Sequence, residues 1–215
     1  MALADLEERG DPDAGLTPEE RLAKHAALRT ESDMLRAQFL EDFQRSGTDP
    51  RRLERVPIDV DYDVPASSLQ QAISDAEIVV LGRVKSVEFR YEGNGIIVNY
   101  LTVDVEQTFK GTRSSGTITV AQLGGPEQIF HGDGSQHTVL AETPGDPLLF
   151  EGDEAFLLLV PAQAQGIFQS SGPFVSQYRV DGGQLRAVDG NPFGLTIERQ
   201  SPAEFEAALS SLSRP

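Results

Sequence analysis

The fold is decided by the stretch Asp75–Gly111, whose sequence is DAEIVVLGRVKSVEFRYEGNGIIVNYLTVDVEQTFKG. Its first run, Ile78–Leu81, is apolar, rich in β-branched residues and too short to span a membrane. Gly82 follows, and the apolar positions change parity between Val84 and Val87, which indicates a β-bulge. A glycine inside a strand, followed by such a slip, predicts a strand that bends sharply while it stays paired.

A tight turn and a second long strand complete this stretch. The segment Glu92–Gly95 favours a hairpin, because Asn and Gly both tolerate positive φ. The second strand is predicted over Ile96–Phe109, with Leu101, Val103 and Val105 on one face. A long bent strand paired with a long return strand predicts a small closed or half-closed β-barrel.

Shorter strands follow along the chain. A third strand is predicted over Thr117–Ala121 and ends at the glycine pair 124–125. The segment Phe130–His137 has the composition of a hairpin tip, and Ala155–Val160 is continuously apolar, which predicts burial on both faces. A hairpin turn at Asp181–Gly183 joins the last two strands. The pattern therefore predicts a mainly β domain with five to six barrel strands.

Helices are predicted at both ends of the chain. Thr17 and Glu20 form a capping box around Pro18, which suits the first position of a helix. Ser201 begins the C-terminal helix by the same logic. The apolar residues that recur at roughly helical spacing are Leu22, Leu28, Leu35, Phe39 and Phe43 in the first helix and Phe205, Leu209 and Leu212 in the second.

The apolar face of the first helix has two interpretations. In one, the helix packs on its own domain. In the other, the helix docks on a protein partner or on a second copy, and Leu28, Leu35, Phe39 and Phe43 are then partner-binding residues. The run is too short and irregular to predict a coiled coil.

Composition and charge limit the classes of function. The chain has 215 residues and a formal net charge of −16, and the acidic residues are spread over its whole length. Nucleic-acid binding needs a basic surface that displaces counterions from phosphates, so no nucleic-acid partner is predicted. The absence of Cys excludes disulfides and thiolate metal sites. No membrane-spanning segment and no signal peptide are predicted within the printed sequence.

Candidate chemistry is sparse. His131 and His137 flank Asp133, and two imidazoles beside a carboxylate could bind a divalent metal ion, although their spacing matches no standard ligand pattern. The alternative is a solvated loop. No glycine-rich loop precedes a helix, and no nucleophile–base–acid set is recognisable, so we predict neither a cofactor nor an enzyme.

Several of these segments resemble a known family. Asp75–Val84, Leu101–Gly111, Thr117–Val120 and Phe150–Leu159 are similar, in order, to strands and turns of bacterial export-associated domains with a five-stranded OB-type barrel. These domains are related in shape to netrin-like domains and tissue inhibitors of metalloproteinases. The resemblance covers about residues 66–190 and implies a location outside the cytoplasm, with a cytoplasmic location as the alternative. The animal inhibitors act through an N-terminal Cys, which this sequence lacks, so their mechanism is not implied.

The resemblance and the patterns together predict four regions. A disordered acidic segment (1–16) and a helical extension with an acidic linker (17–64) precede an OB-like β-barrel (65–190), and a C-terminal helix (191–215) packs on the barrel. The expected function is a non-catalytic interaction module that binds a protein partner or self-associates. The alternative is a domain that binds a divalent cation or a small ligand through region 130–153.

Overall fold

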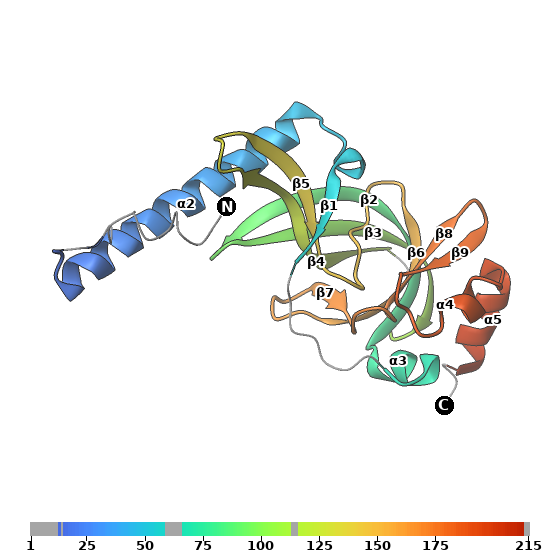
Figure 1. Cartoon of the computed structure of the whole chain (residues 1–215). Coiled ribbons are helices and arrows are strands. Elements are labelled where there is room, and N and C mark those ends of the chain that lie inside the picture. Colours follow the sequence, from blue (N-terminus) through green and yellow to red (C-terminus); the bar gives the residue numbers. More distant parts are fainter. Residues whose placement is uncertain (1–12, 14, 59–65, 113–115, 213–215) are drawn as a thin grey trace.

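The protein is mainly β, with helices at both ends of the chain (Figure 1). The computed structural model describes residues 13, 15–58, 66–112 and 116–212. Most of the predicted disordered segment (1–16) and most of the acidic linker lie outside these residues, although Asp13 is described and pairs with Lys24 and His25 of the first helix. The helices are α2 (Pro18–Ser46), η1 (Pro50–Arg52), α3 (Leu69–Asp75), α4 (Gly194–Ile197) and α5 (Pro202–Leu212). The strands are β1 (Glu54–Pro57), β2 (Ile78–Gly93), β3 (Ile96–Lys110), β4 (Gly116–Phe130), β5 (Gln136–Glu142), β6 (Glu154–Pro161), β7 (Ile167–Ser170), β8 (Gln177–Asp181) and β9 (Gln184–Ala187).

Strands β2 and β3 form the long hairpin that the sequence predicted. Their register shifts between Leu81 and Gly82 and again between Val84 and Ser86, so the predicted bulge is confirmed. A Cβ atom on Gly82 would lie 2.6 Å from Cγ1 of Val103, so only glycine allows this close approach of the two strands.

Five strands close into a ring. β2 pairs with β3, β3 with β4, β4 with β7, β7 with β6, and β6 with β2. The β4–β7 pair is parallel and the other four are antiparallel. The interior of this ring is filled by buried apolar side chains from its strands, among them Leu101, Val103, Val120 and Leu157.

The sheet extends beyond the ring. Over the described residues it contains nine strands, so the prediction of a clean five- to six-stranded barrel is wrong. One edge of β6 is divided: its first half pairs with β8, to which β9 adds, and its second half pairs with β7. The sheet therefore closes through β7 and continues outward through β8 and β9.

Strand β4 belongs both to the closed ring and to the extension of the sheet formed by β5 and β1. It was predicted to end at the glycine pair, but it continues through Gly124 and Gly125 to pair with β5, which in turn pairs with β1. A Cβ atom on Gly124 would lie 2.3 Å from the Ala141 oxygen, and its φ is +126°. These glycines therefore form a corner rather than a terminus, because they let the strand turn while its ladder of hydrogen bonds continues.

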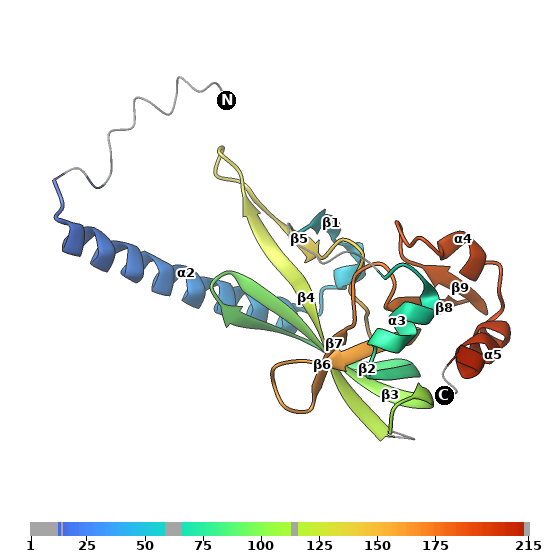
Figure 2. The ribbon, with the colours of Figure 1, turned by 90° about the horizontal axis from the view of Figure 1, so that it is seen from below.

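Helices α3 and α5 cover the outer side of this sheet near β6 and β8 (Figure 2). Phe205 and Leu209 of α5 are fully buried, and the Phe205 ring lies 5.0 Å from those of Phe156 and Tyr178. The expected capping of α5 is present, since the Glu204 carboxylate accepts hydrogen bonds from the Ser201 backbone and hydroxyl.

Helix α2 begins at the predicted capping box and runs for 29 residues. Its C-terminal half packs on the sheet through Leu40 and Phe43, which contact Phe89 and Leu148 in a buried cluster. Its N-terminal half projects away from the sheet (Figures 1 and 2). None of the helices in the described part of the chain has the length and apolar content of a membrane-spanning helix.

Candidate functional site

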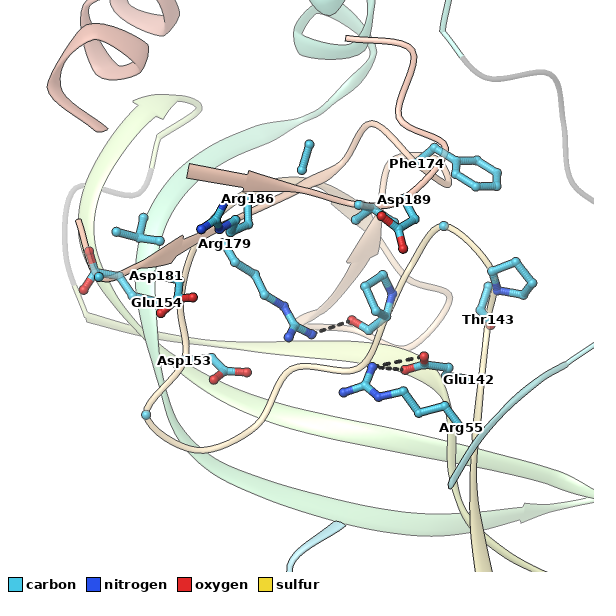
Figure 3. Close-up of a pocket in the computed structure, with 18 of the residues that line it drawn as sticks. Arg55, Glu142, Thr143, Asp153, Glu154, Phe174, Arg179, Asp181, Arg186 and Asp189 are labelled. Atoms are coloured by element: carbon cyan, nitrogen blue, oxygen red, sulfur yellow. Dashed lines mark hydrogen bonds and ion pairs between the residues drawn. The ribbon is translucent and has the colours of Figure 1, made fainter. Parts of the chain in front are cut away.

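A wide pocket lies between the β8–β9 hairpin, strand β1 and the segment that links β5 to β6 (Figure 3). Its volume is about 1060 Å³. Charged side chains of both signs dominate its lining. They are Arg55, Arg83, Arg179 and Arg186 among the bases and Glu142, Asp153, Glu154, Asp181 and Asp189 among the acids.

Arg179 and Arg186 come from the two strands of one hairpin. They are direct partners in the β8–β9 register, so their side chains leave the same face of the sheet. Arg179 is half-buried, and its Nη2 donates to the backbone oxygens of Leu148 and Pro147. Its Nε is buried without a hydrogen-bond partner. Burial lowers the pKa of Arg179, and the neighbouring charge of Arg55 acts in the same direction.

Three carboxylates of the pocket lining form closed ion pairs with other arginines. Nη1 of Arg55 donates to both carboxylate oxygens of Glu142, at 3.0 and 2.9 Å. Arg83 is bound to Glu154, and Arg51 outside the lining lies 2.9 Å from Asp153. These three carboxylates are therefore occupied by arginines of β1, β2 and η1.

A buried polar network supports the segment between Asp146 and Leu149. The Nε2 of Gln122 donates to Asp146 at 3.2 Å, and its Oε1 accepts from the Leu149 N–H at 2.9 Å. The amide of Gln177 donates to the Pro147 oxygen at 3.2 Å. Burial raises the pKa of Asp146 to about 6, so this carboxyl titrates near neutral pH.

Phe174 lines the pocket in an uncommon backbone conformation, with φ of +65°. Its ring lies against two glycines: a Cβ atom on Gly145 would be 2.7 Å from the ring, and one on Gly190 would be 2.9 Å away. Its N–H donates to the Gly145 oxygen at 2.6 Å. Backbone strain of this kind persists only where the surrounding structure enforces it, and it concentrates at functional sites.

The predicted metal residues lie at the tip of the β4–β5 hairpin. His131 and His137 stack, and Nε2 of the first is 2.6 Å from Nδ1 of the second. Asp133 instead accepts hydrogen bonds from the Ser135 hydroxyl and N–H, which lower its pKa. Within the described residues, no three His, Asp or Glu side chains form a group that could hold a metal ion. Metal binding at this tip stays a prediction.

The predicted partner-binding residues of α2 divide into two pairs. Phe43 is buried and Phe39 is half-buried against the sheet, whereas Leu28 and Leu35 are 51% and 61% exposed. Leu28 and Leu35 are two helical turns apart and share one side of the helix. Leu22 and Met34, which are also exposed, lie on other sides. The amphipathic pattern therefore positions only the C-terminal half of α2 on the sheet.

Sequence reasoning missed the arginine pair of the pocket. Its signal is nevertheless visible, because the predicted two-residue turn at Gly182 and Gly183 places Arg179 opposite Arg186. No protein-family model matches the chain, and no curated protein matches it significantly.

Proposed function

We propose that the protein is a non-catalytic interaction module built on an OB-type barrel, which binds a separate protein through the exposed side of α2. The barrel assignment is supported by the order of the closed ring and by its single parallel pair, β4–β7, because OB-folds are five-stranded Greek-key barrels. The exported or envelope-associated location implied by the resemblance is part of the proposal, and cell fractionation tests it.

One observation carries the proposal. The apolar strip that packs α2 on the sheet, Phe43 and Phe39, continues toward the N-terminus of the helix as exposed Leu35 and Leu28. A long helix that extends beyond its own domain with such a strip resembles the helix-in-groove mode of recognition. In that mode, a groove on the partner would cover the part of the apolar strip that the sheet leaves exposed.

The charge of the chain favours a different protein over a second copy. Two copies would each contribute a net charge of −16, and mutual repulsion opposes their association. A partner with an apolar groove framed by basic residues would instead be attracted over a distance of about 10 Å at moderate salt. The occupant that we propose is therefore a basic protein.

The test places the photo-crosslinking residue p-benzoylphenylalanine at position 35 of the full chain in native cells. The matched control places it at position 195, where Leu195 is 79% exposed on α4. We expect one discrete product from position 35 and none from position 195. Excess wild-type protein should abolish this product, whereas excess of the Leu28→Glu/Leu35→Glu variant should not.

Two outcomes would contradict the proposal. A product of twice the chain mass would identify a second copy as the occupant. Equal products from positions 35 and 195, or none from either, would remove the α2 surface as a docking site. Once mass spectrometry has identified the partner, binding of the purified pair should weaken as salt rises, because opposite charges are then screened.

A further inference from the structure

The two neighbouring arginines of the pocket, Arg179 and Arg186, would be stabilised by a bound anion. Arg179 and Arg186 lie directly opposite each other on neighbouring strands, an arrangement of like charges that is unfavourable by itself. The described residues provide neither guanidinium with a carboxylate within ion-pair distance; Arg186 donates only to the Gln184 amide oxygen, at 3.2 Å. An anion between the two would relieve their repulsion and accept charge-assisted hydrogen bonds from guanidinium N–H groups that the backbone oxygens do not occupy.

Three of the carboxylates in the lining are not available for this role. Glu142 is held by Arg55, Asp153 by Arg51 and Glu154 by Arg83. Figure 3 shows Arg179 reaching across the pocket between Arg186 and the Arg55–Glu142 pair. The buried Nε of Arg179 is a further donor without a partner in the described structure, and an unsatisfied buried donor costs stability. The arginine pair is therefore the cationic centre of this pocket.

The other lining residues indicate the size and polarity of the rest of the ligand. Val56, Val180 and the strained Phe174 contribute apolar surface, whereas Asp181 and Asp189 add exposed acceptors at the rim. A volume of about 1060 Å³ suits a small organic molecule rather than an inorganic ion alone. The net charge of −16 disfavours polyphosphates and other polyanions, since each additional negative charge is repelled by the whole molecule.

We propose that this pocket binds a small organic monocarboxylate, whose carboxylate lies between Arg179 and Arg186 and whose hydroxyl or amino groups face Asp181 and Asp189. This inference goes beyond the proposed function, because the pocket lies apart from the exposed side of α2 and its occupancy does not depend on a protein partner. The recognition is that of a charge-assisted bidentate pair in a partly desolvated site.

The test uses the full chain and a panel of named probes. The carboxylates are acetate, lactate, gluconate, galacturonate and glycine, each compared with its neutral amide where one exists, and inorganic phosphate is the comparison anion. Binding is measured by thermal unfolding and by NMR titration of the arginine Nε–H signals. At least one carboxylate should raise the Tm and shift the Arg179 signal, because a ligand that binds only the folded state stabilises it. Its amide should do neither.

A matched pair of variants distinguishes the site from general charge. Arg186→Gln removes one exposed guanidinium of the pocket, and Arg52→Gln removes an 87% exposed guanidinium outside it. We expect Arg186→Gln to weaken carboxylate binding about tenfold and Arg52→Gln to leave it unchanged. The proposal is overturned if no carboxylate binds at millimolar concentration, if phosphate binds as well as the best carboxylate, or if both variants weaken binding equally.

Discussion

Asp146 is a carboxyl group buried beneath a pocket that contains arginines. This residue is 8% exposed, and the pKa of its carboxyl is raised from 3.8 to about 6 because burial penalises the charged form. The folded protein therefore binds this proton more tightly than the unfolded chain does. The free energy of unfolding that Asp146 contributes is highest when the group is protonated in both states, and it falls as pH rises from about 4 to about 6.

Replacement of the Asp146 carboxyl by an amide should remove this pH dependence of the free energy of unfolding. Asp146→Asn keeps an oxygen for the Gln122 hydrogen bond and carries no charge. At neutral pH we expect it to raise the free energy of unfolding by up to about 3 kcal/mol, a gain that disappears near pH 4. Urea denaturation of both proteins across this range measures the difference. Asp133→Asn, at an exposed carboxyl whose pKa Ser135 lowers, should show no such gain.

Gly82 gives a second prediction at a single position. A methyl group there meets Val103 Cγ1 at 2.6 Å and the Asp104 backbone oxygen at 2.8 Å. Gly82→Ala should therefore lower the free energy of unfolding by roughly 1–3 kcal/mol, as overpacking does. Gly132→Ala is the control, because nothing lies within 4 Å of its Cβ position. Similar losses in both variants would show that strand bending does not require the glycine.

At the scale of elements, α2 combines a packed half and a projecting half. Gln44 donates to the Phe89 oxygen at 3.1 Å, Asp33 accepts from the Tyr91 hydroxyl, and Arg36 lies 3.4 Å from Glu127. These contacts attach the helix to β2 and β4, whereas the residues before Asp33 extend beyond the sheet (Figure 1).

The two halves should respond differently to truncation. Phe43→Ala removes a ring that is 9% exposed and should lower the free energy of unfolding by about 3 kcal/mol. Leu35→Ala, at an exposed helical position, should change it by less than about 0.5 kcal/mol while it weakens partner crosslinking. Chemical denaturation of the two variants makes the comparison. A large loss of stability in Leu35→Ala would mean that this side of α2 packs against its own domain rather than on a partner.

Most elements could be predicted from local patterns. The bend at Gly82, the Asn94 turn and the caps at Thr17 and Ser201 all depend on residues close together in sequence. Strand β1 was missed because its four residues, Glu54–Pro57, are mostly exposed and owe their conformation to a parallel partner, β5, more than eighty residues away. The glycine pair in β4 was predicted to end the strand for a similar reason. The strand continues through these glycines only because it pairs with β5, and the local sequence does not show that pairing.

At the scale of the whole molecule, the pocket unites segments that the sequence keeps far apart. Arg55, Glu142, Arg179 and Arg186 meet only because β1, β5, β8 and β9 are assembled around β4 and β6. No local sequence pattern predicts that these four residues lie together. The net charge of −16, in contrast, follows from the composition alone.

This charge leads to a prediction about assembly. In light scattering after size-exclusion chromatography, the chain alone should have a mass of 23.3 kDa at both low and physiological salt, because repulsion opposes self-association. A stable dimer at physiological salt would contradict the choice of a separate protein as the occupant of α2.

The corner in β4 has a thermodynamic consequence. On one side of Gly125 the strand presents Glu127 to Arg36 of α2, and on the other Gly124 is paired with Glu142, which holds Arg55 at the pocket wall. One strand thus joins the docking helix to the ligand pocket. If the bound carboxylate changes the affinity for the protein partner by some factor, linkage requires the partner to change the affinity for the carboxylate by the same factor. A titration of either ligand in the presence of the other measures one coupling free energy.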